Sequence, residues 1–120
     1  MSTNDLARAR TDDPDDPDLA AARLVLEAAW RARVDDITRL NTELLDLFET
    51  AGSDSTRAQQ EVLDEQLRAA WLAAGQYELA LGRIASGAYG TCEDCGQPIS
   101  VARLETIPEA SSCTGCQRRH

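Results

Sequence analysis

Apolar residues recur at alternating steps of four and three along two stretches of the chain. The first stretch runs from Leu19 to about Thr50 without Gly or Pro, and the second runs from about Ser55 to Ala85. The recurring positions are Trp30, Val34, Ile37, Asn41, Leu44 and Phe48 in the first stretch, and Leu63, Leu67, Ala70, Ala74, Tyr77, Leu81 and Ile84 in the second. This spacing is the heptad pattern of a coiled coil, so we expect two long helices, each with one apolar seam.

The residues between the two stretches predict a turn. Gly52 is a natural C-terminal cap for the first helix, and Asp54, Ser55 or Thr56 can cap the second. Folding the helices back about this turn brings together pairs of positions whose two residue numbers add up to 107 or 108. The pairs are Leu44 with Leu63, Ile37 with Ala70, Val34 with Ala74, Trp30 with Tyr77, and Leu26 with Leu81. Large residues face small ones at mid-length, so residue volume supports an antiparallel hairpin in this register.

Two residues near the seam have open roles. Asn41 lies opposite Leu67, where it either fixes the register as a buried amide, at some cost in stability, or turns out to solvent. Trp71 lies just off the seam. We favour the interpretation that Trp71 covers the core from the flank over the alternative of an exposed contact residue.

The N-terminal residues have a composition that disfavours folding. Residues 1–17 contain five aspartates, Pro14, Pro17 and one leucine, so we expect a disordered acidic leader. Asp16 or Asp18 is a suitable N-cap for the first helix. The chain begins without an apolar signal segment, and no apolar run approaches the roughly 18 residues of a membrane span. We therefore expect a cytoplasmic protein with no membrane partner.

The charge balance excludes some functions. The formal net charge is -9 and the sequence pI is about 4.4, which makes the chain a poor binder of phosphate backbones. Sequence-specific DNA binding is therefore disfavoured. The chain has one histidine, no serine–histidine pairing that geometry could support, and no phosphate-cradling glycine loop. We expect that the protein is not an enzyme.

The four cysteines form two pairs near the C-terminus, and they carry the clearest chemical signal. The pairs are Cys92-Glu93-Asp94-Cys95 and Cys113-Thr114-Gly115-Cys116. A two-residue spacer lets both sulfurs of a pair reach one metal ion, and zinc prefers four thiolates in structural sites. The expected cofactor is one structural zinc ion bound by all four cysteines, which leaves no open position for catalysis. Gly96 and Gly115 can relieve the tight turns around the sulfurs.

Other uses of the cysteines are weaker. Two disulfides need an oxidising compartment, and a redox dithiol needs only one pair in a strand–helix context. His120 could replace one ligand, although beside Arg118 and Arg119 it fits a solvated tail better. The remaining apolar residues of this segment, such as Ile99 and Leu104, are too few to build a core unaided, so the metal must supply what burial cannot.

The residues around the cysteines resemble the DksA/TraR zinc-finger family. The similarity is dense from about residue 77 to 117, and the predicted hairpin agrees with the family's architecture. The residues that carry the resemblance are Leu81-Gly82-Arg83-Ile84, Gly87-Ala88-Tyr89-Gly90-Thr91-Cys92-Glu93-Asp94-Cys95-Gly96, Ile99, Arg103-Leu104-Glu105, Pro108, Ala110, Cys113 and Cys116.

The resemblance implies a fold and a function. The fold is mostly α, with an antiparallel coiled-coil hairpin at residues 18–86, a tip near residues 50–58, and a four-cysteine zinc finger at residues 87–120. Proteins of this family bind bacterial RNA polymerase directly, insert the hairpin into its secondary channel, and shift the stability of promoter complexes. We expect a monomer that acts in this way. The alternative is a zinc-stabilised coiled-coil adaptor that binds another protein.

The tip departs from the family's pattern. Some members of the family carry an acidic pair and an alanine there, spaced Asp-x-x-Asp-x-Ala. Thr56-Arg57-Ala58 resembles the end of that motif, but Ser53 and Thr56 then occupy both acidic positions.

A second alignment of the tip, without gaps from Cys92, is also possible. It places Glu49, Gly52 and Asp54 on the three motif positions, so neither alignment restores the motif. Asp54 then has two open roles: a helix cap, which we favour, or a contact near the catalytic centre. The expected partner-binding residues of the tip are Glu49, Ser53, Asp54, Thr56, Arg57 and Ala58.

Some family members bind the alarmone ppGpp together with the polymerase through basic side chains. Aligned on the cysteines, those positions are Gln76, Ile107 and Gln117, none of which is charged. A polyanion gains little from such residues, so the sequence does not favour alarmone dependence through this site.

Overall fold

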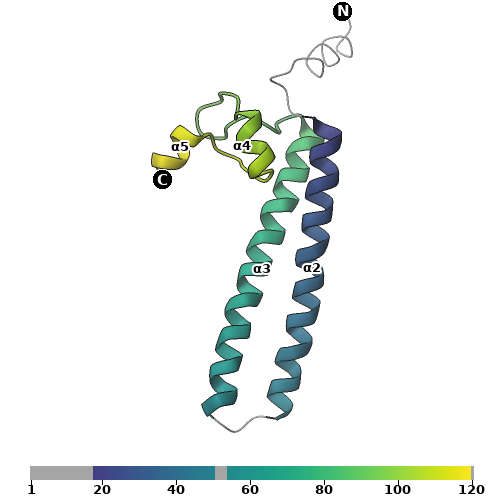
Figure 1. Cartoon of the computed structure of the whole chain (residues 1–120). Helices are drawn as coiled ribbons and strands as arrows, with labels where there is room; N and C mark the ends of the chain where they lie inside the picture. Colours follow the sequence, from purple (N-terminus) through teal and green to yellow (C-terminus); the bar gives the residue numbers. More distant parts are fainter. Residues whose placement is uncertain (1–17, 51–53, 120) are drawn as a thin grey trace, which may run out of the picture. The chain divides into compact units, whose positions relative to one another are not determined.

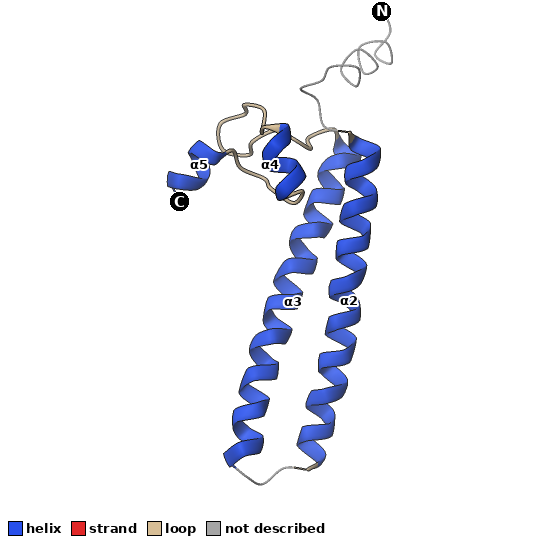
Figure 2. Ribbon diagram, in the orientation of Figure 1, coloured by secondary structure: helices blue, strands red, loops and turns tan. Residues whose placement is uncertain are grey.

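The computed structural model describes residues 18–50 and 54–119, and their regular structure is helical (Figures 1 and 2). The elements are α2 (Leu19–Glu49), α3 (Asp54–Ser86), α4 (Val101–Thr106) and α5 (Thr114–Arg119). Two long packed helices form a hairpin, and a four-cysteine cluster follows them, which confirms the predicted fold class. Within the described ranges, no helix combines the length and the apolar character that crossing a membrane requires.

The chain divides into two compact units. The middle unit comprises residues 28–78, and the finger unit combines residues 18–27 with residues 79–119. Both long helices contribute to both units. The proposed division into leader, hairpin and finger differs from these units and stays a prediction. The leader at residues 1–17 lies outside the described residues.

The ends of the long helices follow ordinary capping chemistry. The backbone N–H of Ala21 donates to Asp18 Oδ1 at 3.1 Å, so Asp18 is the N-cap of α2. At the other end, the hydroxyl of Thr50 donates to the carbonyl oxygens of Asp46 and Leu47 at 3.3 and 3.2 Å. Asp54 lies in the first turn of α3, where its negative charge complements the helix dipole. The predicted cap Gly52 lies outside the described residues.

The core of the middle unit lies between α2 and α3. Ile37, Leu40, Ala70 and Ala74 are each at most 8% exposed, and Trp30, Leu63 and Leu67 pack against them. Large residues of α2 thus meet alanines of α3, as residue volume predicts. The indole N–H of Trp30 donates to Glu78 Oε1 at 2.8 Å, which places Trp30 at the predicted level of α3.

The seam of α2 differs from the prediction by one residue in its second half. Asn41 and Phe48 are exposed, and Leu40 and Leu47 point inward instead. Leu40 and Leu47 are seven residues apart, as are Asn41 and Phe48, so either pair can continue the seam with Ile37 and the buried Leu44. The leucine pair is the buried one because burying the Asn41 amide without a hydrogen-bond partner would be costly. The solvent-facing interpretation of Asn41 is confirmed, and the seam positions predicted for Asn41 and Phe48 are wrong.

The inward shift requires Arg33 to lie beside the core. Arg33 and Val34 are both partly buried. The Arg33 guanidinium reaches Asp36 Oδ2 at 3.2 Å, while its Nε is buried without a hydrogen-bond partner. A long arginine stem can cover apolar surface while its charged end stays in water. Arg33 is therefore tolerated beside the core, although the sequence pattern placed its neighbour Val34 on the seam.

Trp71 does not cover the core. Its side chain is 60% exposed, so the favoured interpretation is wrong and Trp71 is a surface residue. Two helices bury one stripe each, and within the middle unit no third helix covers their flanks. A residue next to the seam therefore remains in solvent.

The corrected seam yields a paired test. We expect Leu40→Ala to destabilise the hairpin by about 2–5 kcal/mol because it empties a buried position. Asn41→Ala should change stability by less than about 0.5 kcal/mol because its side chain is exposed. Urea denaturation followed by circular dichroism measures both. A larger loss for Asn41→Ala than for Leu40→Ala would restore the seam that the sequence pattern predicted.

Candidate metal centre

The first cysteine pair sits on a tight turn of the finger unit. Thr91 and Pro98 form an antiparallel bridge at its base. Inside it, the N–H of Cys92 donates to the carbonyl of Gln97 at 2.8 Å, and the N–H of Gly96 donates to the carbonyl of Cys92 at 3.0 Å. Gly96 has φ 74°, a conformation that favours glycine, so its predicted role is confirmed.

The second pair opens α5. The N–H of Cys116 points at the sulfur of Cys113 at 3.5 Å, and the N–H of Gln117 donates to the carbonyl of Cys113 at 2.9 Å. Gly115 lies within the helix and is not among the described glycines with positive φ. A Cβ there would meet other atoms only at ordinary contact distance. The predicted turn-relieving role of Gly115 is therefore wrong.

Polar contacts fasten the two turns together. The N–H of Glu93 donates to the carbonyl of Ser111 at 2.9 Å, and the hydroxyl of Ser112 donates to Asp94 Oδ2 at 2.9 Å. Arg103 Nε donates to the carbonyl of Ser112 at 3.0 Å from α4. These bonds hold the segment before the second pair against the first pair, independently of any metal.

Two further side chains brace the finger unit. Arg83 on α3 donates to the carbonyl of Glu109 at 3.2 Å and pairs with Glu93 at 3.5 Å. The hydroxyl of Tyr89 donates to the carbonyl of Pro108 at 2.8 Å, and burial raises the pKa of this phenol. Sequence analysis placed Arg83, Tyr89 and Arg103 in the family resemblance but assigned them no contact. No sequence pattern marks these contacts, because they join residues that lie 9 to 26 positions apart.

A small apolar core supports this scaffold. Ile99 and Leu104 are 2% and 4% exposed, whereas Ile107 is 37% exposed and caps the end of α4. Tyr89 and Ala110 are also buried. The core of this segment is thus as small as predicted, so cross-linking by a metal remains important.

The four sulfurs meet the size requirement of a zinc site. The Sγ atoms of Cys92, Cys95, Cys113 and Cys116 all lie within 4.8 Å of one another. The sulfurs of Cys95 and Cys113 are 3.8 Å apart. Zinc–sulfur bonds of about 2.3 Å in a tetrahedron require sulfurs about 3.8 Å apart, whereas a disulfide requires about 2.0 Å. All four cysteines are free, so the donor set fits one zinc ion.

The electrostatics of the cluster also favour a cation. Hydrogen bonds from backbone amides, chiefly that of Cys113, lower the pKa of Cys92 to about 6. The amide of Cys116 lowers the pKa of Cys113. The pKa of Cys116 is raised to about 12, first by its hydrogen bond with the Cys113 side chain and then by burial. The thiolate form is thus favoured at Cys92 and Cys113 and disfavoured at Cys116. A bound dication would stabilise the thiolate form of all of them.

The other predicted site residues are not members of this cluster. Glu49, Asp54, Arg57 and Ala58 are exposed at the ends of α2 and α3 that flank the turn, and Thr56 is partly buried. Ser53 and the possible ligand His120 lie outside the described residues. The three alarmone-related positions fall on α3, at the end of α4 and on α5, and all are exposed: Gln76, Ile107 and Gln117.

Comparisons with known proteins agree with this architecture. Residues 87–120 match the model of the prokaryotic dksA/traR C4-type zinc finger. Two curated proteins from strains of Caulobacter vibrioides, each named RNA polymerase-binding transcription factor DksA, are 37% identical to this chain over 76 residues. The match covers 62% of this chain and 51% of each relative, so it spans about half the length of those relatives.

A solved structure extends the similarity to the hairpin. The structure of transcription factor DksA2 from Pseudomonas aeruginosa matches with a TM-score of 0.77 and 26% identity. The match covers 84% of this chain and 81% of that chain. The relatives carry the names of transcription factors, in line with the expectation that this chain is not an enzyme. Together with the sulfur geometry, the zinc-finger match establishes one zinc site at the four cysteines.

Removing one zinc ligand should show that the finger depends on the metal and that the long helices do not. Cys95 is exposed, so Cys95→Ser changes no buried packing and acts through the metal alone. We expect zinc affinity to fall by more than about a hundredfold, because losses in the outer shell already cost 10–100-fold. The finger should unfold while most helicity remains. Elemental analysis and circular dichroism measure this, with Gln97→Ser as control. Full zinc content in Cys95→Ser would contradict the four-cysteine site.

Proposed function

Because the chain belongs to the DksA/TraR C4-type zinc-finger family, we propose that it is a transcription regulator that binds RNA polymerase directly. In this proposal the turn between α2 and α3 enters the secondary channel, through which nucleotides reach the catalytic centre. The protein then shifts the stability of promoter complexes without sequence-specific DNA contacts. It works as a monomer in the bacterial cytoplasm.

One observation carries the proposal: the similarity covers both the finger and the hairpin. The curated relatives are named as RNA polymerase-binding. The match to the DksA2 structure covers 84% of this chain with a TM-score of 0.77. A zinc finger alone would support many functions, because such modules occur in proteins of many kinds. The long helix pair narrows the choice.

The helices have suitable dimensions for a narrow pore. α2 has 31 residues and α3 has 33, so each is about 45–50 Å long at 1.5 Å per residue. A net charge of -9 also disfavours competition for the template DNA. The finger is a structural element in this account, since its four sulfurs fill the coordination of zinc.

We assign polymerase contacts to the tip. The candidates are Glu49, Ser53, Asp54, Thr56, Arg57 and Ala58, of which Glu49, Asp54, Arg57 and Ala58 are exposed. Asp54 combines two functions in this proposal, because its charge favours the first turn of α3 and also faces the partner. The absence of charge at Gln76, Ile107 and Gln117 supports action without ppGpp at the site formed by those positions.

A second candidate function is supported by the surface of the middle unit. Trp71 and Leu72 are 60% and 65% exposed on α3. Exposed aromatic and aliphatic side chains of this size are typical of protein-binding surfaces. A coiled-coil adaptor with another partner would use this surface, and binding to core RNA polymerase separates the two functions.

The first functional prediction concerns reach. Deleting residues 37–43 together with 64–70 removes one matched heptad from each helix and preserves the register. Each helix loses about 10 Å. The deletion removes Ile37, Leu40 and Ala70, and Leu44, Leu47 and Leu63 then take their places in the seam. We therefore expect the shortened chain to fold and bind zinc. It should lose its effect in transcription from a ribosomal-type promoter in vitro. If the shortened chain regulates as well as the parent, insertion into the pore is wrong and the adaptor function becomes the better account.

The second functional prediction concerns charge at the tip. Asp54→Asn keeps an oxygen that can cap α3 but removes the negative charge. We expect a partial loss of regulation with a change in stability below about 1 kcal/mol. Asp64→Asn is the matched control, because it makes the same change at an exposed aspartate of α3 outside the tip. Equal regulation by Asp54→Asn and the parent, measured in the same transcription assay, would restrict Asp54 to helix capping.

A further inference from the structure

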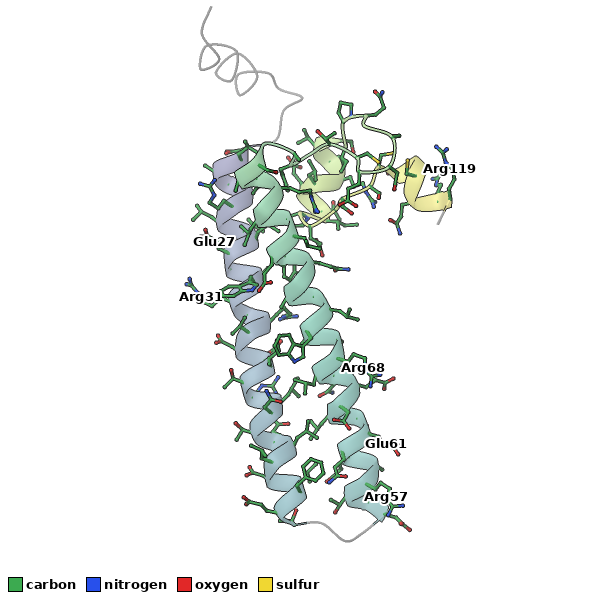
Figure 3. All side chains as sticks on the ribbon, turned by 180° about the vertical axis from the view of Figure 1, so that it is seen from behind. Glu27, Arg31, Arg57, Glu61, Arg68 and Arg119 are labelled. Carbon is green, nitrogen blue, oxygen red and sulfur yellow. The ribbon has the colours of Figure 1, made fainter. Side chains whose placement is uncertain are left out.

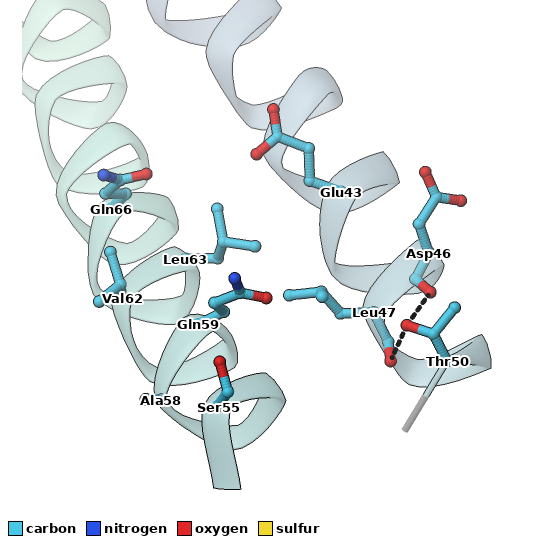
Figure 4. Close-up of a pocket in the computed structure, with 10 residues that line it drawn as sticks. All are labelled: Glu43, Asp46, Leu47, Thr50, Ser55, Ala58, Gln59, Val62, Leu63 and Gln66. Atoms are coloured by element: carbon cyan, nitrogen blue, oxygen red, sulfur yellow. Dashed lines mark hydrogen bonds between the residues drawn. The ribbon is translucent and has the colours of Figure 1, made fainter. Parts of the chain in front are cut away.

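A groove lies between α2 and α3 next to the turn (Figure 4). It belongs entirely to the middle unit and has a volume of about 710 Å³. Its apolar lining comes from Leu47, Val62 and Leu63, and its acidic lining from Glu43 and Asp46. Polar uncharged side chains complete the wall. The groove was not predicted, because no sequence pattern marks an unfilled stretch of a seam.

The groove is open because the facing sides of α2 and α3 carry no large apolar residues near the turn. Leu44 is buried, and Leu47 and Leu63 are the last large apolar residues on the facing sides. Beyond them, the facing positions hold short side chains such as Ser55 and Ala58, which cannot fill the space between two helices. The chain therefore leaves apolar surface exposed that its own fold does not use.

The surroundings of the groove are strongly acidic. Residues 43–66 contain seven acidic residues and one basic residue, Arg57. In Figure 3 the Arg57 side chain points away from the hairpin. Glu43 is paired with Arg39 at 3.1 Å, whereas Asp46 takes part in none of the ion pairs found within the described ranges. The groove thus offers an unneutralised carboxylate beside an apolar floor.

The end of α2 adds to this negative potential. The last turn of a helix carries a partial negative charge and is usually accompanied by lysine or arginine. The last turn of α2 has no basic residue and ends in Glu49. Like charges at this end weaken the isolated helix, and none of the ion pairs found among the described residues involves Asp46 or Glu49. A cationic partner would compensate these charges.

We propose that this groove binds a short amphipathic helix that carries lysine or arginine beside its apolar face. The proposal rests on the proposed function and assigns that helix to RNA polymerase. The groove extends from residue 43 of α2 to Thr50, just beyond the end of that helix, and over residues 55–66 of α3. This is about two to three helical turns, which matches the length of a short docked helix. Apolar anchors would enter between the helices, and a basic residue would meet Asp46.

A designed peptide tests the groove without the polymerase. The probe is a 14-residue amphipathic peptide of leucine and lysine, and its control replaces each lysine with glutamate. We expect saturable NMR shifts of the methyl groups of Leu47, Val62 and Leu63 with the lysine peptide only. Val62→Arg should weaken this binding about tenfold or more through charge repulsion. Leu45→Arg, an exposed residue outside the groove with the same charge change, should not.

Two peptide results would overturn the proposal. One is equal binding of the glutamate peptide or of the Val62→Arg chain. The other is a set of shifts that spreads over the acidic surface, or that gathers in the finger unit. That unit has a separate pocket of about 360 Å³, lined by residues such as Val25 and Tyr89.

Binding to core RNA polymerase tests the assigned partner. We expect Asp46→Lys to lower the affinity about five- to tenfold, and Glu61→Lys, with the same charge change outside the groove, to leave it unchanged. Equal affinity of the Asp46→Lys chain would overturn the groove proposal and leave the proposed function intact. If the unaltered chain does not bind the polymerase, the proposed function fails and the assigned partner is wrong, while the peptide result still decides whether the groove takes a basic helix.

Discussion

The packing of large residues of α2 against alanines of α3 is the constraint on which the rest of the structure depends. Ile37 and Leu40 reach between the helices because Ala70 and Ala74 leave room for them. This pairing fixes the register, and the register decides which residues end beside the turn. Where the seam runs out of large residues, beyond Leu47 and Leu63, a groove opens. The sizes of the facing side chains thus determine both the well-packed part of the hairpin and the groove that we assign to a partner.

The finger solves a different problem, because its segment is too short to build a core of its own. Ile99 and Leu104 bury little apolar area in total, and loops make up much of the chain around them (Figure 2). Backbone bonds and the contacts of Arg83 and Arg103 arrange the two cysteine turns. Zinc then links turns that lie about 20 residues apart in the sequence, and its binding free energy contributes to the folding of this small module.

The zinc ligands and the helix pair could be predicted from the sequence because each rests on a simple period. Two cysteines with a two-residue spacer must share a metal or a bond, and a four–three repeat must bury one stripe. The errors in the seam have one physical origin. The period alone does not distinguish Leu40 from Asn41 or Leu47 from Phe48, since both sets recur every seven residues. The burial cost of the Asn41 amide would have decided the choice. Trp71 was misassigned because a two-helix layer leaves its flanks uncovered.

The central claim is that the turn between α2 and α3 works inside the polymerase, and a crosslink tests it most directly. A photoreactive p-benzoylphenylalanine in place of the exposed Arg57 samples the tip, and the same residue in place of Arg68 samples the side of α3 (Figure 3). The account predicts that position 57 crosslinks to the polymerase segments that surround the catalytic centre. Crosslinks from position 57 only to outer surfaces of the polymerase, or none in a complex that forms, would contradict it.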